Sequence, residues 1–551
     1  MRRALIFGLV LLLAGCAGLP TQINVQTGPE LIAPTAQELS FYTPSGPNAG
    51  DSPQEIISGF LAAGTGPQND YSVAREYLTS DFAPRWNPDG GVLLRSGSPV
   101  FRNSGGSLQV VDVNIAASVD DQGRYRDFEN AETNSLRFQL SQEDGEWRIS
   151  SAPNLTVVTP PVFAVVFKAL SLYFLDSTKN HLISDLRWFP SRTSTGTRLV
   201  NALLAGPSDW LSSGVTTAVP ENTRLTIDAV RIVDGVAQVD LDANALKADA
   251  LDRRLMLSQL RNTLLQISGV SDVALSVNNS PQEIVPAPIA VSGSGGSAFA
   301  MDADGISRVA IGDSKGVLGS AALVKNQDPN LFAITDSGNR LAVSGPKGIF
   351  LSESNGISAR VTQLSNVSDI SALFFDTERR LWAFPSDADK SILVFDESGN
   401  QRELSEGLTG TRIGASIGNE GAKLAIIVRV GLESKVHVLT VIRNSTASPI
   451  SLNPGLVLKP VVGDPISLIW QESTGIRVLE RTSSNLTALS EYPLSGPRRQ
   501  LTMPPVVGLK LSEGPAALAT YLLAEDGGVW ALNGTTWRRT TVNGIDISSL
   551  R

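Results

Sequence analysis

Between residues 51 and 160, apolar and polar positions follow first the helical period and then the strand period. The segment Ser52-Pro53-Gln54-Glu55 is the capping pattern of a helix start, and the apolar residues from Ile56 to Leu61 fall on one helical face. A second helix is expected at Ser72 to Leu78. Alternating stretches then predict strands at 108–119, 136–140 and 147–150. Helices followed by a meander indicate an α+β domain with its helices on one sheet face.

Residues 161–280 show a second, differently ordered mixture of the two periods. The expected strands are 172–175, 182–189 and 273–277, and the expected helices are 198–204 and 249–267. Asp234-Gly235 joins two alternating segments and is a strong hairpin turn. The long helix is expected to bury the apolar side that carries Leu251, Leu255, Leu260, Leu264 and Ile267. This order predicts a second α+β domain.

Residues 281–297 are rich in Pro, Ser and Gly and are interpreted as a linker. Beyond them, from 298 to 551, one apolar hairpin recurs six times. Its turns lie at Gly305, Gly338, Arg379, Gly421, Gly475 and Gly527, which are 33 to 54 residues apart. This spacing is typical of four-stranded propeller blades, so we expect an all-β propeller of about six blades. A β-sandwich is the alternative, but six copies of one hairpin favour the propeller.

The first fifteen residues have the pattern of a signal peptide. Arg2 and Arg3 precede an apolar run that is too short to span a bilayer, and the run ends in Leu13-Ala14-Gly15-Cys16. This sequence matches a bacterial lipobox, in which the cysteine thiol receives a diacylglyceryl group. We therefore expect cleavage between Gly15 and Cys16, lipid on Cys16, and a flexible tether at 16–50. An ordinary secretory signal is the alternative, but Cys16 is the only cysteine in 551 residues.

The charge of the chain restricts its partners. The formal net charge is −9, and loss of Arg2 and Arg3 with the signal takes it to −11. An acidic chain without basic clusters argues against nucleic acid, whose phosphates require clustered Lys and Arg. It also provides no electrostatic binding to an anionic membrane, so the lipid alone is expected to hold the protein at the extracytoplasmic face of the cell membrane.

Residues that could carry out catalysis are few. The two histidines, His181 and His437, fall in different predicted domains. The segment from Gly414 to Gly418 matches the G-x-S-x-G nucleophile elbow, but a β-branched strand at Lys423–Val430 follows where the elbow requires a helix. We expect no enzyme activity, no cofactor and no catalytic residues.

One pair of carboxylates could hold a cation. Asp240 and Asp242 point to the same side of a predicted strand, as a hard cation would require. The favoured interpretation is the solvent face of that strand, with Val239 and Leu241 turned inward. No metal site is therefore predicted.

Several stretches of the two α+β domains resemble one family. In the first domain these are Ala74 to Thr79, Arg85 to Pro88 and the final strand around Trp147-Arg148-Ile149-Ser150, which is also similar to nuclear-transport-factor-like domains. In the second domain they are 172–176, 185–190, 203–207, 217–220 and 236–242, together with a helix carrying Gln259, Leu260 and Thr263. With the lipobox and the propeller, they make the chain similar to the actinobacterial lipoprotein LpqB family, with a GerMN domain in the middle.

This resemblance implies a function in signalling. It implies an accessory that binds the extracytoplasmic part of the two-component sensor histidine kinase MtrB and modulates phosphorylation of the regulator MtrA, and thereby the cell envelope and division. The family has no established catalytic residues to carry over. Two other hypotheses remain open: a scaffold or sensor that reads a cell-wall ligand without contacting a kinase, and a hydrolase or lyase at the propeller mouth. The scarcity of histidine and of paired acids disfavours the hydrolase or lyase.

Overall fold

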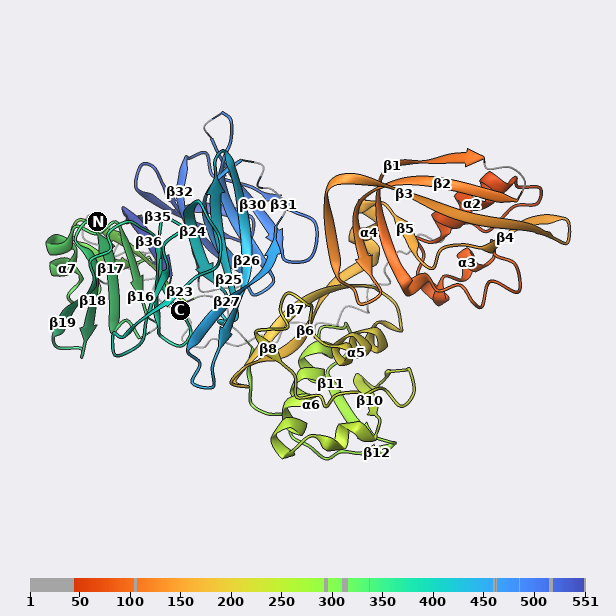
Figure 1. The fold of residues 1–551 in the computed structure, drawn as a ribbon, viewed down its shortest axis with the longest axis horizontal. Coiled ribbons are helices and arrows are strands. Elements are labelled where there is room, and N and C mark those ends of the chain that lie inside the picture. Colours follow the sequence, from red (N-terminus) through yellow and green to blue (C-terminus); the bar gives the residue numbers. More distant parts are fainter. Residues whose placement is uncertain are drawn as a thin grey trace, which may run out of the picture. The chain divides into compact units, whose positions relative to one another are not determined.

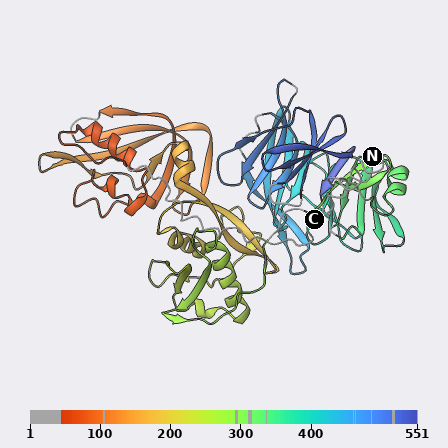
Figure 2. The same cartoon turned by 180° about the vertical axis from the view of Figure 1, so that it is seen from behind.

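The computed structural model describes residues 44–549 except 104–106, 292–295, 310–315, 336, 459–460, 462, 485 and 515–518. In this part of the chain, two α+β domains precede an all-β propeller, as expected (Figure 1). Figure 2 shows the same elements from behind, with the blades seen from their other side.

The first domain is a five-stranded sheet with helices on one face. Helix α2 (Pro53–Ala63) begins with the predicted capping box, because Ser52 and Glu55 exchange side-chain and backbone hydrogen bonds. Its buried residues Ile56, Ile57 and Phe60 belong to the same core as Val111, Phe138 and Ile149 of the sheet. The remaining elements are α3 (Ser72–Arg75), β1 (Gly91–Asn103), β2 (Leu108–Asp120), β3 (Tyr125–Glu143), β4 (Glu146–Ser151) and β5 (Thr156–Val158), in the sheet order β4-β3-β2-β1-β5.

Two details of this domain differ from the sequence prediction. Helix α3 ends at Arg75, three residues earlier than expected, because Tyr77 and Leu78 turn to pair with Ile149 of the sheet. Strand β1 was not predicted, because register shifts after Leu94 and Ser96 interrupt its alternation.

The N-cap of α2 makes a testable contribution to stability. We expect Ser52→Ala to lower the free energy of unfolding of this domain by about 1 kcal/mol, because the N–H of Glu55 loses its acceptor. Urea denaturation followed by circular dichroism would measure the change. Ser58→Ala, inside the same helix, is the control, and an equal effect of both variants would contradict the capping role.

The second domain consists of two small sheets with three α-helices. The first sheet has the order β13-β7-β6-β8 and the second β12-β11-β10-β9. Its elements are α4 (Pro160–Val166), β6 (Phe167–Asp176), β7 (His181–Pro190), α5 (Thr195–Ala205), β8 (Val215–Thr216), β9 (Arg231–Val233), β10 (Val236–Leu241), α6 (Ala250–Leu264), β11 (Asp272–Val277), β12 (Ser280–Pro281) and β13 (Ala290–Val291).

The predicted hairpin and long helix are both present. Asp234 (φ 51°) and Gly235 (φ 78°) form the turn between β9 and β10, and both adopt the left-handed backbone that a type I′ turn requires. Helix α6 buries Leu255, Leu260 and Leu264. Leu251 is 54% exposed, so the prediction that it lies on the buried side of the helix was wrong. It lies in the first turn, ahead of the buried stretch that starts at Leu255.

Part of the segment interpreted as a linker packs against this domain. Ile284, Ala287 and Ile289 contact its hydrophobic core, and the backbone of Ala287 exchanges hydrogen bonds with Arg254 and Ser258 of α6. Ala290 and Val291 then pair in parallel with the start of β7.

The propeller has six blades. The five complete blades are β16–β19, β20–β23, β24–β27, β28–β31 and β32–β35, and the remaining blade joins β15-β14-β36. Because β36 (Asp546–Ser549) pairs with β14 (Ala298–Asp302), the end of the described chain closes the ring against its beginning. The other strands are β15 (Gly305–Arg308), β16 (Leu331–Ile334), β17 (Arg340–Gly345), β18 (Gly348–Ser354), β19 (Ala359–Ser365), β20 (Ile370–Phe375), β21 (Leu381–Pro385), β22 (Ile392–Phe395), β23 (Gln401–Leu404), β24 (Thr411–Ile417), β25 (Lys423–Val430), β26 (Glu433–Arg443), β27 (Pro449–Val457), β28 (Asp464–Gln471), β29 (Gly475–Arg481), β30 (Thr487–Pro493), β31 (Arg499–Leu501), β32 (Gly508–Glu513), β33 (Thr520–Ala524), β34 (Gly528–Asn533) and β35 (Thr536–Asn543).

Buried polar side chains connect neighbouring blades. The guanidinium of Arg412 donates to Glu406 (2.6 Å) and to four carbonyl oxygens of the preceding blade. At the ring closure, the carboxylate of Asp546 accepts from Lys510 (2.5 Å) and from the backbone of Phe332 (3.0 Å), which lie in the two adjacent blades. Hydrogen bonds of both of these buried charged groups cross a blade boundary, which favours this order of the blades.

Candidate functional site

Strand β7 of the second domain contacts both other domains. Its residues His181–Pro190 are mostly buried, and three consecutive parts of it carry polar side chains whose partners lie elsewhere in the chain. Ser184 faces the propeller, Arg187 reaches the first domain, and Trp188 bonds to both. We refer to these contacts of β7 as the junction.

The propeller side of the junction contains a fully buried lysine. The ammonium of Lys423 donates to the carbonyl and hydroxyl oxygens of Ser184 (2.7 and 3.0 Å) and to the carbonyl of Ser473 (2.8 Å). Its charge is balanced by Glu420 at 2.8 Å, and neither side chain is exposed to solvent. Because a buried charge is costly unless it is paired and hydrogen-bonded, this arrangement holds β7 against the propeller in one position.

A second buried ion pair lies within β7 itself. Arg187 donates to Asp185 (2.6 Å), and the other carboxylate contacts of Asp185 come from the backbone and hydroxyl of Ser208 (2.8 and 2.9 Å). Both side chains of the pair are at most 3% exposed. The second guanidinium nitrogen of Arg187 donates to the carbonyl of Gln122 in the first domain (3.0 Å). The pair therefore extends from its own domain into the next one.

Trp188 completes the junction on both sides. Its indole N–H donates to the carbonyl of Ser495 in the propeller (2.9 Å), and its backbone N–H donates to the carbonyl of Gly123 in the first domain (2.8 Å). Gly496, at φ 135°, lies so close that a Cβ there would be 2.9 Å from the indole ring. This close approach explains why a glycine occupies position 496.

The glycine at 496 yields a prediction about the junction. We expect Gly496→Ala to displace the Trp188 ring, because the added Cβ meets it and because an L residue disfavours this backbone angle. Hydrogen exchange of the amides around Ser495 and Trp188 should become faster by at least tenfold. Gly534→Ala, at a turn with open space around it, is the control and should leave these amides unchanged.

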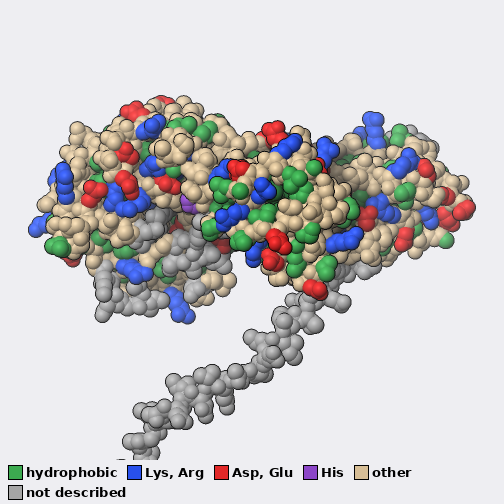
Figure 3. Space-filling model, turned by 90° about the horizontal axis from the view of Figure 1, so that it is seen from below, with side chains coloured by type: hydrophobic (Ala, Val, Ile, Leu, Met, Phe, Trp, Pro, Cys, Tyr) green, Lys and Arg blue, Asp and Glu red, His purple; other side chains and the backbone are tan. Residues whose placement is uncertain are grey.

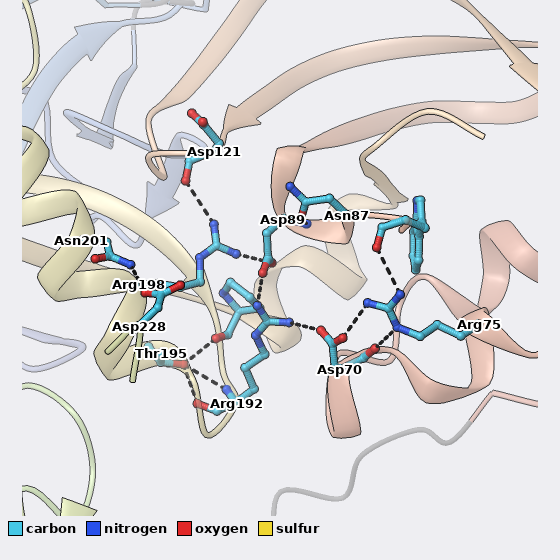
Figure 4. A network of polar contacts seen from close by, with 12 residues as sticks. Asp70, Arg75, Asn87, Asp89, Asp121, Arg192, Thr195, Arg198, Asn201 and Asp228 are labelled. Atoms are coloured by element: carbon cyan, nitrogen blue, oxygen red, sulfur yellow. Dashed lines mark hydrogen bonds and ion pairs between the residues drawn. The ribbon is translucent and has the colours of Figure 1, made fainter. Parts of the chain in front are cut away.

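A network of charges also connects the first and second domains (Figure 4). Asp89 accepts hydrogen bonds from both Arg192 and Arg198, which lie just before and within α5. Arg192 also pairs with Asp70 (3.4 Å), and Arg198 donates to the carbonyl of Asp121 (3.2 Å). Two arginines of one domain thus hold three acidic residues of the other.

The acidic side of this network rests on a strained turn. Asn69, Asp70 and Tyr71 all have left-handed backbone angles, with φ between 46° and 56°. Such angles are unfavourable for residues other than glycine and persist where the surroundings hold them. Here Arg75 holds the turn through its bonds to the carboxylate (2.5 Å) and backbone (2.9 Å) of Asp70. Burial raises the pKa of Tyr71 well above its ordinary value, so its phenol stays neutral.

The junction is suited to positioning and not to proton transfer. Its buried cations are each bound to a carboxylate or to carbonyl oxygens, and burial lowers the pKa of Arg198 only from an already very high value. A general acid or base must reach its substrate, and these paired groups are buried and bound to one another. What the geometry provides is a fixed arrangement of three domains around one strand.

The residues that the sequence suggested as candidates for catalysis lie on different strands. His181 starts β7 in the second domain, and His437 lies in β26 of the propeller, where burial lowers its pKa and leaves the ring neutral at pH 7. Ser416 is in strand β24, and strand β25 follows, so its segment does not form a nucleophile elbow. Within the described ranges, no group of three or more His, Cys, Asp or Glu residues is placed to hold a metal ion.

Asp240 of β10 and Asp242, which follows the strand, have structural roles. Asp240 accepts from the hydroxyl of Ser276 (2.7 Å) and the backbone of Asn279 (2.8 Å), and Asp242 caps the turn that follows. Burial raises the pKa of Asp240, but these hydrogen bonds outweigh burial and hold the pKa below its ordinary value. Val239 and Leu241 are fully buried, so the interpretation as a strand face with apolar residues inward is confirmed.

Cys16 and its lipobox lie outside the described residues, as does the segment to residue 43. No helix in the described part of the chain is both long and apolar enough to cross a membrane. On the face seen in Figure 3, acidic and basic side chains are interspersed.

Sequence reasoning did not identify Lys423, Arg187 or Trp188 as functional residues. One indication was available, since Asp185–Pro190, which carries Arg187 and Trp188, was among the stretches that resemble a known family, and Arg85–Pro88 ends beside Asp89, which accepts from Arg192 of the second domain. No indication marked Lys423, because an isolated lysine in a strand ordinarily faces solvent.

Family models match the three domains in succession. Residues 46–164 match the model described as Lipoprotein LpqB, N-terminal domain, and residues 305–544 match Lipoprotein LpqB beta-propeller domain. Between them, residues 171–283 match a model described as Sporulation and spore germination, the Germane or GerMN domain. The chain belongs to the LpqB lipoprotein family.

Relatives named Lipoprotein LpqB occur across several actinobacteria. The Cutibacterium acnes protein is 30% identical over 51% of this chain and 47% of its own length, so this match spans about half of that relative. The Streptomyces avermitilis protein is 24% identical but is matched over 98% of both chains. Among solved structures, a chain of a nidogen/laminin complex covers 47% of this chain and 99% of its own at 13% identity, with a TM-score of 0.36.

Proposed function

We propose that this LpqB-family lipoprotein is anchored to the extracytoplasmic face of the cell membrane and binds a two-component sensor kinase of the MtrB type. By contacting the extracytoplasmic part of the kinase, it modulates phosphorylation of the response regulator and so influences the envelope and cell division. The observation that carries the proposal is the junction, in which one strand connects all three domains through buried, paired charges.

The junction supports binding because it reduces the entropy that association costs. Domains that are already fixed relative to a common strand present their surfaces in one arrangement, so less freedom is lost when a partner binds. A lipid anchor adds to this effect, because it confines both proteins to one membrane and raises their effective concentration. Even a weak contact can then shift the equilibrium between states of the sensor.

The proposal is tested by direct binding. The mature chain should bind the purified extracytoplasmic domain of the kinase in biolayer interferometry and should not bind that of an unrelated sensor kinase. In vesicles that contain the full kinase, addition of the lipidated chain should change the rate of autophosphorylation by at least twofold. Absence of both effects, combined with retention on purified peptidoglycan, would instead favour a scaffold that reads cell-wall material.

A further inference from the structure

The propeller carries an apolar groove that the junction does not use. It lies between helix α7 (Ser320–Gln327) and the outer part of the neighbouring blade, β18 and β19, which Figure 1 shows side by side. Its volume is about 340 Å³. The lining residues are Leu318, Gly319, Ala322, Leu323, Asn326 and Gln327 on the helix side and 357–359 and Val361 on the strand side.

The groove has two walls that meet at its floor. On the helix side, Leu318 and Gly319 lead into α7, whose Ala322 and Asn326 are four residues apart and share one face. On the strand side, Ala359 and Val361 of β19 share one face, and Ile357 lies in the turn before the strand. The walls approach most closely at Gly319, where a Cβ would be 3.0 Å from the Cβ of Ala359.

Both walls hold apolar side chains out in solvent. Ile357 is 90% exposed, and Val361 and Leu318 are about half exposed. The position of Ile357 is fixed, because the side chain of Asn355 accepts hydrogen bonds from the backbone of Ile357 (3.0 Å) and Ser358 (2.8 Å). Ile357, Leu318 and Val361 line one groove, and a contiguous exposed apolar patch of this kind marks an interaction surface.

The surroundings of the groove are basic, although the chain as a whole is acidic. Lys325 lies on α7, and the ammonium of Lys347 donates to the backbone of Asn326 in the lining. Neither lysine has an ion-pair partner among the described residues. One acid, Asp328, lies at the end of α7, whereas Arg360 and Glu353 pair across β18 and β19 on the opposite face of the blade, where Arg340 binds Glu353 (3.1 Å).

We infer that this groove is the docking site for a segment of a partner protein in which apolar side chains are flanked by carboxylates. The apolar anchors fill the groove, and the carboxylates face Lys325 and Lys347. Strand β19 ends the order of its sheet, so its outer edge is open to the incoming segment. The inference rests on the proposed function, because it identifies the surface through which the chain contacts its protein partner.

The test compares variants of exposed residues, which should leave the fold intact. Leu318→Ser with Ile357→Ser removes the apolar contacts that the groove offers, and Lys325→Glu reverses the charge beside it. The matched controls are Leu432→Ser, an exposed leucine of another blade, and Arg402→Glu, on β23, the corresponding outer strand of the next blade. Binding of the full mature chain to the extracytoplasmic kinase domain is measured for each.

We expect both groove variants to weaken binding at least tenfold and both controls to change it less than twofold. Binding should also weaken as salt increases, because the cations are exposed. If the wild type binds and the groove variants bind equally well, the groove inference is overturned and the proposed function stands.

Failure of the kinase domain to bind the wild type would instead overturn the proposed function. The groove is then tested with a fluorescent peptide that carries leucines four residues apart and flanking glutamates, and with its lysine counterpart. Binding of the glutamate peptide alone, lost in both groove variants, would support the docking site, and equal or absent binding of both peptides would overturn it. A change from dimer to monomer in the groove variants would also overturn it, because the occupant would be a second copy of the chain.

Discussion

Lys423→Met is expected to lower the free energy of unfolding by about 3–5 kcal/mol, because it leaves the carboxylate of Glu420 buried and without its partner. The ammonium also supplies hydrogen bonds to the oxygens of Ser184 and to the carbonyl of Ser473, and these acceptors would remain buried. The loss should appear first in the propeller and in β7, which meet at this lysine.

The measurement is hydrogen exchange resolved by segment, together with urea denaturation followed by tryptophan fluorescence. Lys435→Met, in β26, is the matched control: its ion pair with Glu433 is partly exposed, so its removal should change stability by less than about 0.5 kcal/mol. The double variant Lys423→Met with Glu420→Leu should recover part of the loss, because the isolated charge is removed with its partner. An unchanged stability in Lys423→Met would show that the buried pair does not hold β7 against the propeller.

Cys16→Ser is expected to release the protein from the membrane and to abolish its regulatory effect. Without the thiol there is no site for the diacylglyceryl group, whose two acyl chains contribute about 0.8 kcal/mol per buried CH₂. No helix of the described residues can span a membrane, and the net charge of the mature chain opposes binding to anionic lipid. The folded domains should be unaffected, since the described structure begins at residue 44.

Cell fractionation should find the Cys16→Ser protein in the soluble extracytoplasmic fraction, and mass spectrometry should show that it carries no lipid. A deletion strain that carries this variant should behave as the deletion. Fusion of the same chain to a transmembrane helix is the control, and it should restore both membrane location and regulation. Full complementation by the soluble form would contradict the role of the tether while leaving the fold unaffected.

Local patterns in the sequence were sufficient to predict most elements of the fold. The capping box at Ser52 and the turn at Asp234-Gly235 depend on neighbours within a few residues, so their consequences are visible in the sequence itself. The six hairpin turns predicted the blades for the same reason, since each blade repeats one local unit. Strand β1 was not predicted, because register shifts interrupt its alternation. Helix α3 was predicted too long, because the chain after it pairs with Ile149 of a strand that is distant in sequence.

The junction depends on contacts over long sequence distances, and only the tertiary structure revealed it. Ser184 and Lys423 are 239 residues apart, and Trp188 and Ser495 are 307 apart. No periodicity connects such pairs, and a lysine that balances a buried charge looks in sequence like any surface lysine. The groove beside α7 has the same origin, because its two walls become neighbours only when adjacent blades pack.

The sequence by itself determined the class of each domain, because that class depends on local periodicity and repeats. The signal peptide and the lipid on Cys16 remain predictions. The tertiary structure alone decided which strand connects the domains and which charges are buried. The physical reason is that burial and pairing are properties of the folded neighbourhood, which residues far apart in the chain create together.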